Sequence, residues 1–188
     1  MVKKVNISNI ELEILGLFTK SYDKQYYIRE TSKILNISSR TSLLNLNKLE
    51  KKGILESYTK GKIRLFKIKE SFLAKNYFLL VEQYKLVKFL EKNNKIKEVV
   101  KKLTLLIKGT AIIFGSYAKF RAKKDSDIDI YIETKNRNIK KQIENIHSKI
   151  SVKIGLFDVK SNLIKEIIKN HVIVRGVEDF YEKKQVFK

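Results

Sequence analysis

The sequence predicts an α+β protein with two domains joined by helices. Three observations support this prediction: residues 1–70 read as short helices followed by a hairpin, residues 71–107 carry helical periodicity, and residues 108–188 mix apolar strands with helices. The strands and helices of the last part follow no regular βα repeat, so an α/β fold is not expected. We therefore expect one domain over 1–70, a helical connector over 71–107 and a small mixed-sheet domain over 108–188.

The first domain is expected to contain a helix, a short extended piece, two helices around a tight turn, and a hairpin. Apolar residues recur at helical spacing between Leu12 and Phe18, and Ser8 or Asn9 is the expected N-cap. Ser38 or Ser39 is the expected cap of the third helix. The expected segments are 12–18, 26–28, 29–35, 39–51, 54–58 and 63–68.

This order of elements is similar to the winged helix-turn-helix family, and the run Leu49–Leu55 resembles the segment between recognition helix and wing in many prokaryotic regulators. The resemblance implies that the third helix enters the major groove of DNA, while the hairpin, or wing, contacts the backbone or the minor groove. The residues expected to contact DNA are Arg40, Ser42, Asn45 and Lys48 of the helix and Lys60, Lys62 and Arg64 of the wing. The alternative is a protein–protein module, in which Leu44 packs on the second domain or on a twin subunit.

The connector is expected to form two helices that break at Asn93-Asn94. The first of these helices is apolar nearly all round, which is typical of a helix buried between domains or in a dimer. A homodimer is therefore expected. The second helix leads into the apolar run Thr110–Phe114.

The last domain is expected to contain short strands separated by helices, with Ser161 as a helix cap and a short terminal helix after Gly176. The expected strands are 110–114, 127–132, 151–157 and 171–175, and the expected helices are 139–150 and 161–169.

Two short motifs of this domain carry its chemistry. In the run 127–130, acid and isoleucine alternate, so Asp127 and Asp129 point to the same face of a strand, about 7 Å apart at their bases. Two such carboxylates repel each other unless a cation neutralises them, and hard divalent metals are the natural occupants. Gly115 and Ser116 follow an apolar strand, where backbone N–H groups at the start of a helix favour a phosphate.

This pattern resembles the active-site signature of the polymerase-beta-type nucleotidyltransferase superfamily, in particular its minimal branch. The matching residues are Gly115, Ser116, Ala118, Ser126, Asp127, Ile128 and Asp129. The resemblance implies that Asp127 and Asp129 are catalytic and hold Mg²⁺ or Mn²⁺. It implies that Gly115, Ser116, Lys119 and Ser126 bind an NTP, with ATP the expected one.

By the same resemblance, a nucleoside monophosphate would pass to a protein, an RNA or a small molecule. Minimal members often act as antitoxins paired with a HEPN-domain toxin, so such a toxin is an expected partner. The residues themselves do not name the acceptor.

The chain departs from the family pattern at two positions. Phe120 stands where minimal members usually carry glycine, and Ser151 stands where a neighbouring strand normally supplies a third carboxylate. Asp158 and Glu133 are possible substitutes for that acid. The alternative function is a non-catalytic DNA-binding regulator with a nucleotide-sensing or dimerising second domain, and a third carboxylate near the acid pair would favour the enzyme.

Composition and net charge further restrict the partners and the kinds of site expected for this protein. The net charge of +21 is spread over both halves of the chain and favours polyanionic partners such as nucleic acid. The chain contains no cysteine, which excludes disulfides and thiolate zinc sites. Its two histidines cannot supply a histidine-rich metal site. No apolar run approaches the roughly 20 residues of a membrane span, and no signal peptide is recognised, so a cytoplasmic protein without membrane contact is expected.

Overall fold

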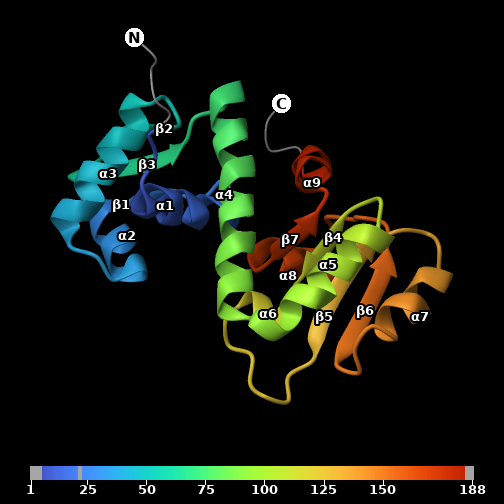
Figure 1. Cartoon of the computed structure of the whole chain (residues 1–188). Helices are drawn as coiled ribbons and strands as arrows, with labels where there is room; N and C mark the ends of the chain where they lie inside the picture. The colour runs from blue at the N-terminus through green and yellow to red at the C-terminus, as the bar shows by residue number, and fades with distance from the viewer. Residues whose placement is uncertain (1–5, 21–22, 185–188) are drawn as a thin grey trace, which may run out of the picture. The chain divides into compact units, whose positions relative to one another are not determined.

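The computed structural model describes residues 6–20 and 23–184, which divide into two compact units (Figure 1). Unit 1 extends to Val81 and unit 2 begins at Glu82. The division falls within one continuous helix, α4 (Phe72–Lys92), which contributes residues to both units.

Unit 1 contains three helices and a small antiparallel sheet of strand order β1-β3-β2 among its described residues. The elements are α1 (Asn9–Lys20), β1 (Tyr26–Tyr27), α2 (Ile28–Leu35), α3 (Ser39–Lys51), β2 (Leu55–Lys60) and β3 (Ile63–Ile68). This order and this sheet are the winged-helix topology, with β2 and β3 as the wing.

The helix caps confirm the sequence prediction. The Glu11 amide donates to Ser8 Oγ and the Ser8 amide donates to the Glu11 carboxylate, a reciprocal capping box at the start of α1. Ser38 Oγ accepts from the Thr41 amide at the start of α3. The wing is longer than predicted, because Lys60 pairs with Ile63 and only Gly61 and Lys62 form the turn.

After α4, the predicted break at Asn93-Asn94 is confirmed by a short 3₁₀ turn, η1 (Asn94–Ile96), followed by α5 (Lys97–Leu106). The rest of unit 2 holds a four-stranded sheet of order β6-β5-β4-β7. Its elements are β4 (Ala111–Ile113), α6 (Gly115–Ala118), β5 (Ile128–Glu133), α7 (Asn138–Glu144), β6 (Ile150–Gly155), α8 (Asn162–Lys169), β7 (Val172–Arg175) and α9 (Val177–Lys183).

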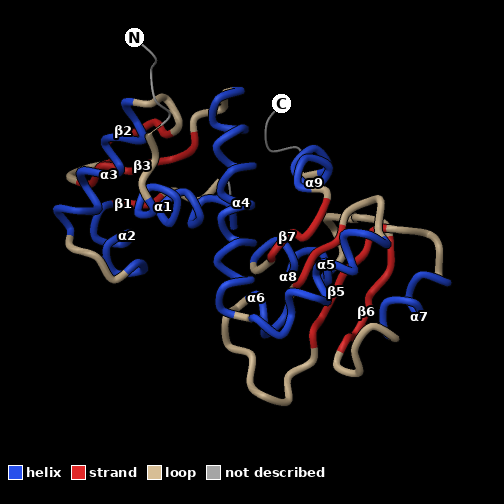
Figure 2. The backbone as a smooth tube through the Cα atoms, in the orientation of Figure 1, coloured by secondary structure: helices blue, strands red, loops and turns tan. Residues whose placement is uncertain are grey.

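The sheet of unit 2 is mixed, since β5 and β6 are parallel while β4 pairs antiparallel with both β5 and β7. Ile128, Ile130 and Ile132 of β5 enter a core that also contains Val99 and Leu103 of α5. Figure 2 shows the long loop that joins α6 to β5 and brings the chain back to the sheet. The α+β class is therefore confirmed. The helix predicted over 139–150 is wrong in its second half, because α7 ends at Glu144 and Ile150 already pairs with Ile128.

A buried polar cluster lies within unit 2. Glu82 of α4 is fully buried, and its Oε1 accepts from the Tyr181 hydroxyl at 2.7 Å. His171 Nε2 lies 3.2 Å from the same oxygen, and Lys85 Nζ lies 2.8 Å from Oε2. Burial alone would raise the pKa of Glu82, but the positive charge of Lys85 and the neighbouring His171 lower it to about 2. The fold thus holds an ionised carboxylate inside unit 2.

Candidate active site and DNA-binding surface

The acid pair of unit 2 lies at the start of β5. Ile128 and Ile130 are buried, which directs Asp127 and Asp129 to the opposite side of the strand. Asp127 is exposed and Asp129 is half-buried. Asp127 directly precedes β5, and its carboxylate is close enough to Asp129 to raise the pKa of that residue.

Gly115 lies directly against this pair. It has a φ of 68°, and a Cβ built on it would lie 2.2 Å from Asp129 Oδ2 and 3.1 Å from its carboxyl carbon. The neighbouring Phe114 amide donates to the Asp129 carbonyl oxygen at 3.0 Å, which ties the end of β4 to β5. Any other residue here would be strained by the positive φ, and its Cβ would displace the Asp129 carboxylate.

Three further charged side chains surround Asp129. Lys119 Nζ pairs with Glu166 Oε1 of α8 at 3.0 Å, and Lys153 projects from β6. Burial and the Asp127 carboxylate raise the pKa of Asp129, Glu166 raises it further, and Lys153 and Lys119 partly offset the rise. The Asp129 carboxylate therefore carries an electrostatic cost that a bound cation would relieve.

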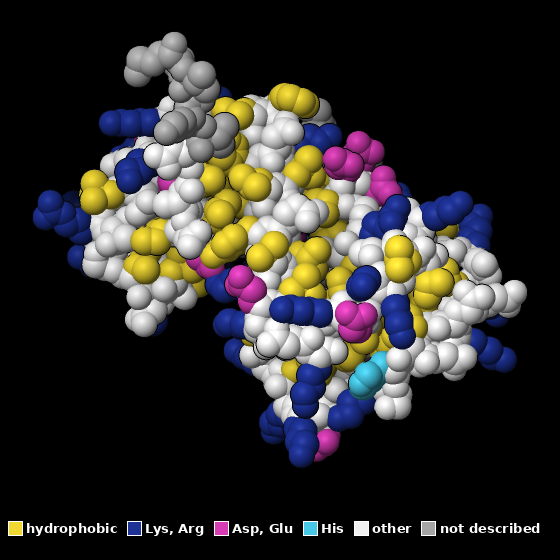
Figure 3. All heavy atoms as spheres, in the orientation of Figure 1, with side chains coloured by type: hydrophobic (Ala, Val, Ile, Leu, Met, Phe, Trp, Pro, Cys, Tyr) yellow, Lys and Arg dark blue, Asp and Glu magenta, His cyan; other side chains and the backbone are white. Residues whose placement is uncertain are grey.

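The loop between α6 and β5 contains Lys119 and Ser126. Ser126 Oγ accepts from the Lys123 amide at 2.8 Å and so closes a turn just before Asp127. Figure 3 shows Lys and Arg side chains gathered over this loop. Lys149 Nζ donates to the Lys124 carbonyl oxygen, which fixes the loop to the start of β6.

Ser151 is the register partner of Asp129 on the parallel strand β6. Glu133 pairs with Gly155 and Lys183 at the far end of β5, four residues or about 13 Å from Asp129. Asp158 follows Gly155 beyond that same end. Among the described residues, neither acid joins Asp127 and Asp129 in a group of three that could hold a metal.

Glu166 is the acid that the sequence did not identify. It lies on α8 beside the buried residues Ile164 and Ile167, and nothing in the sequence distinguishes it from an ordinary solvated helix residue. Within the described residues, no group of three or more His, Asp or Glu side chains is arranged to hold a metal.

The residues present nevertheless fit a single divalent cation. Asp127, just before β5, and Asp129 within it supply hard oxygen donors, and the side-chain-free Gly115 leaves the Asp129 carboxylate unobstructed by a neighbouring Cβ. Burial and the Asp127 carboxylate raise the pKa of Asp129, and a bound cation would act in the opposite direction.

Phe120 adopts a φ of 53°, the left-handed conformation for which glycine is best suited. Its ring packs edge-on against the buried Phe89 at a centroid distance of 6.3 Å, and Lys92 Nζ lies 5.0 Å from the ring centroid. The backbone thus keeps the glycine-like turn, and the aromatic side chain is accommodated against α4.

In unit 1, α3 exposes a stripe of Arg40, Leu44, Lys48 and Lys51. Ser42 and Asn45 do not belong to it. Ser42 is fully buried and donates to the Ile28 carbonyl oxygen at 3.1 Å, and Asn45 is buried and donates to the Thr41 carbonyl oxygen at 2.8 Å. Their prediction as DNA contacts is wrong, because their polar atoms are used inside the unit.

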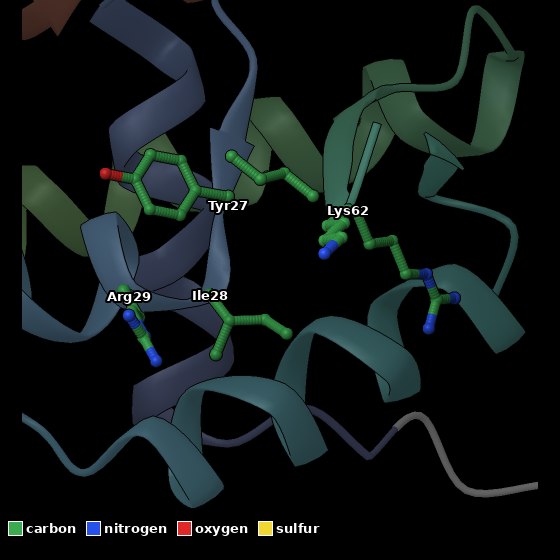
Figure 4. Close-up of a pocket in the computed structure, with 6 residues that line it drawn as sticks. Tyr27, Ile28, Arg29 and Lys62 are labelled. Atoms are coloured by element: carbon green, nitrogen blue, oxygen red, sulfur yellow. The ribbon is translucent and has the colours of Figure 1, made fainter. Parts of the chain in front are cut away.

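On the wing, Lys60 and Lys62 are exposed, as a phosphate contact requires. Arg64 is half-buried, pairs with Glu50 and donates to Asn47 and Ser57, so a phosphate would have to compete with Glu50 for it, and its contact with DNA stays a prediction. A hollow of about 500 Å³ lies between the start of α2 and the wing. Figure 4 shows Ile28 and Lys62 projecting toward this space from its two sides.

Residues 85–179, just over half of the chain, match the family described as polymerase beta, nucleotidyltransferase. The chain belongs to this nucleotidyltransferase family. The matched range contains Gly115, Ser116, Asp127 and Asp129, the residues brought together at the start of β5. No curated protein sequence matches the chain.

Several solved transcription regulators are structurally similar to parts of the chain. The adhesin competence repressor AdcR of Streptococcus pyogenes is 18% identical with a TM-score of 0.41, covering 54% of this chain and 79% of that one. BldR of Sulfolobus solfataricus is 16% identical with a TM-score of 0.41, covering 54% and 72%. MepR of Staphylococcus aureus is 20% identical with a TM-score of 0.38, covering 53% and 79%.

No helix in the described part of the chain combines the length and apolar character needed to cross a membrane.

Proposed function

We propose that unit 2 is a Mg²⁺-dependent nucleotidyltransferase that passes a nucleoside monophosphate from an NTP, with ATP the expected donor, to an acceptor. The observation that carries this proposal is the contact between Gly115 and Asp129. The side-chain-free Gly115 lies against the Asp129 carboxylate of β5, and the Asp127 carboxylate just before the strand interacts with Asp129. This arrangement is suited to holding a polyphosphate and a cation together.

Asp127 and Asp129 would hold the cation, either Mg²⁺ or Mn²⁺. When bound, such a metal neutralises charge on the transferring phosphorus and on the leaving pyrophosphate. The chain's own residues position the nucleotide: Gly115 lets the backbone approach the phosphates, and the Ser116 hydroxyl lies next to it in the chain. Because α6 has only four residues, close backbone approach contributes more than a helix dipole does.

Lys119 would add positive charge to the triphosphate site. It is paired with Glu166 in this structure, so a bound nucleotide would compete with Glu166 for its ammonium group. The turn that Ser126 closes places Asp127 at the entrance of β5. Each of these residues binds or orients, and none is assigned a proton transfer.

The test is transfer of label from each α-labelled NTP, with Mg²⁺, to components of a lysate from the source organism. We expect a labelled protein, RNA or small molecule with the wild type and none with Asp127→Ala or Asp129→Ala. Asp125→Ala is the matched control, because Asp125 is the neighbouring loop acid and its side chain is 95% exposed. Equal labelling by all four proteins would refute the assignment.

Ser151 supports a second candidate function, a regulator that binds nucleotide without transferring it. The position beside Asp129 lacks a carboxylate, and a two-metal mechanism would need one there. Nucleotide binding that requires Asp129, together with no labelled acceptor under any condition, would select this candidate.

We further propose that unit 1 binds DNA through α3 and the wing. The exposed cations Arg40, Lys48, Lys60 and Lys62 support this proposal, and they favour the phosphate backbone. Affinity should fall steeply with salt, and Lys48→Ala should lower the slope of log K against log salt by about 1. An acceptor or partner such as a HEPN-type toxin stays a prediction of the family resemblance.

A further inference from the structure

Leu44 is the one apolar side chain that α3 exposes. It is 51% exposed, whereas Leu46 and Leu49 of the same helix are fully buried and Leu43 is partly buried. Leu46 and Leu49 form the apolar side by which α3 packs within unit 1. The core of the unit therefore does not account for Leu44, which lies on the outer side of the helix.

The surface of α3 around Leu44 is polar and positively charged. On a helix, the nearest surface neighbours of a residue lie three and four positions away, and for Leu44 these are Arg40, Thr41, Asn47 and Lys48. None of the four is apolar. Arg40 and Lys48 are exposed, and neither forms an ion pair with a residue that the structure describes. On this helix, Leu44 is thus a single apolar group between two cations that are free to bind a partner.

This combination favours DNA over an apolar protein surface as the partner of α3. The centre of a protein interface is a contiguous patch in which lysine is depleted, and Leu44 has no apolar surface neighbour on its helix. In the major groove of DNA, phosphates flank the edges of the bases, and thymine presents a methyl group. Cations on both sides of one apolar side chain match that arrangement in charge and in chemistry.

The polar neighbours of this surface are already engaged within unit 1. Ser42 and Asn45 are buried and donate to backbone carbonyl oxygens, and the side-chain oxygen of Asn47 accepts from an arginine of the wing. Contacts of α3 with the edges of bases therefore fall to Arg40 and Leu44, the exposed residues of its first half that differ most in the groups they bind.

We propose that Leu44 is a specificity-determining residue that contacts the methyl group of a thymine in the major groove. This inference rests on the proposed DNA binding by unit 1 and adds the base that α3 selects. Arg40 precedes Leu44 by about 6 Å along the helix axis, which is comparable with two base-pair steps. Because arginine is the commonest specific partner of guanine, a guanine is expected within about two base pairs of this thymine.

Deoxyuridine provides the test, because it pairs as thymine does but lacks the methyl group. The wild-type full chain first selects its site from a library of random duplexes, and each thymine of that site is then replaced by deoxyuridine. We expect replacement of the contacted thymine to weaken binding about 4-fold, the effect of one buried methyl group. Leu44→Ala should bind the thymine and deoxyuridine duplexes equally, and both more weakly than the wild type binds the thymine duplex.

Lys48→Ala is the matched control on the same side of α3. Loss of a phosphate contact should weaken binding to the thymine and deoxyuridine duplexes by the same factor, so the 4-fold preference is kept. Circular dichroism establishes that both variants are folded.

The outcomes separate this inference from the DNA binding on which it rests. Three results would overturn the role of Leu44 and leave DNA binding in place: no sequence enrichment among the bound duplexes, wild-type binding that no deoxyuridine weakens, or an unchanged thymine preference in folded Leu44→Ala. The last result is the one expected if Leu44 instead packs on a protein. Absence of wild-type binding to any duplex at low salt would overturn both proposals.

Discussion

The polar side chains of the α3 surface in unit 1 and of the acid pair in unit 2 differ in whether the fold itself satisfies them. In unit 1, Ser42 and Asn45 donate to backbone carbonyl oxygens of the same unit, and Arg64 forms an ion pair with Glu50. In unit 2, burial and the nearby Asp127 carboxylate raise the pKa of Asp129. Polar groups satisfied by the fold contribute to stability, whereas groups the fold leaves unsatisfied are available for a ligand.

The largest effect on stability is expected at Glu82, a buried carboxylate contacted by Tyr181, His171 and Lys85. Glu82→Ala should lower the free energy of unfolding by about 3–5 kcal/mol, because it leaves Lys85 and His171 without their carboxylate. Glu82→Gln should cost less, since it keeps an acceptor for Tyr181. Chemical denaturation measures both.

The dependence of stability on pH provides a second test of Glu82. Its folded-state pKa of about 2 lies below the ordinary 4.5, so its stabilising contribution is present above pH 4.5 and is lost as the pH falls toward 2. The wild type should therefore lose more stability than Glu82→Gln over this range. Parallel curves for the two proteins would show that Glu82 is not ionised in the fold.

The next largest effect is expected at Gly115. Gly115→Ala should reduce nucleotide binding at least about 100-fold, because the new Cβ would displace the Asp129 carboxylate, and it adds a conformational cost of about 1–2 kcal/mol. Gly61→Ala is the matched control, since Gly61 has a φ of 62° but nothing within 4 Å of a new Cβ. If both substitutions left nucleotide binding unchanged, the close approach at Gly115 would have no role in the site.

A smaller effect separates the two kinds of residue on α3. Ser42→Ala should cost about 1 kcal/mol of stability through its lost hydrogen bond to Ile28 and leave DNA affinity unchanged. Arg40→Ala should do the reverse, lowering DNA affinity without changing stability. Fluorescence anisotropy with duplex DNA and thermal melting distinguish the two outcomes, and a loss of DNA affinity in folded Ser42→Ala would contradict the burial argument.

The smallest effect is expected at Asp129. Because its pKa is raised, the ionised form destabilises the fold at neutral pH, and Asp129→Asn should slightly raise the melting temperature when no divalent cation is present. Mg²⁺ should stabilise the wild type and not the variant. A lower melting temperature for metal-free Asp129→Asn would mean that this carboxylate is already satisfied by the fold.

The acid pair was predictable because a strand has a period of two. Alternating acids and isoleucines predict one shared face for the two acids, and burial of Ile128 and Ile130 fixes the face of Asp129, while Asp127 directly precedes β5. The helix surface was less predictable. At 3.6 residues per turn, Ser42 is rotated about 200° from Arg40, so polarity alone was a poor guide to the exposed stripe of α3.

Two other features could not be found from the sequence for physical reasons. The pairing of Arg64 with Glu50 joins α3 to the wing and depends on how they fold together. The position of Glu166 near Asp129 depends on how α8 packs on the sheet, and no local pattern encodes that packing. The family resemblance predicted Ser151 at the position beside the acid pair, and the parallel register of β5 and β6 pairs it with Asp129.

Calorimetric titration of ATP into the full chain, with and without Mg²⁺, tests the central claim most directly. The account predicts binding that requires the cation and is lost in Asp129→Ala, while Asp125→Ala binds as the wild type does. Binding of equal strength without any divalent cation, or unchanged binding in Asp129→Ala, would contradict the assignment of Asp127 and Asp129 as the unsatisfied carboxylates that hold a metal and its nucleotide.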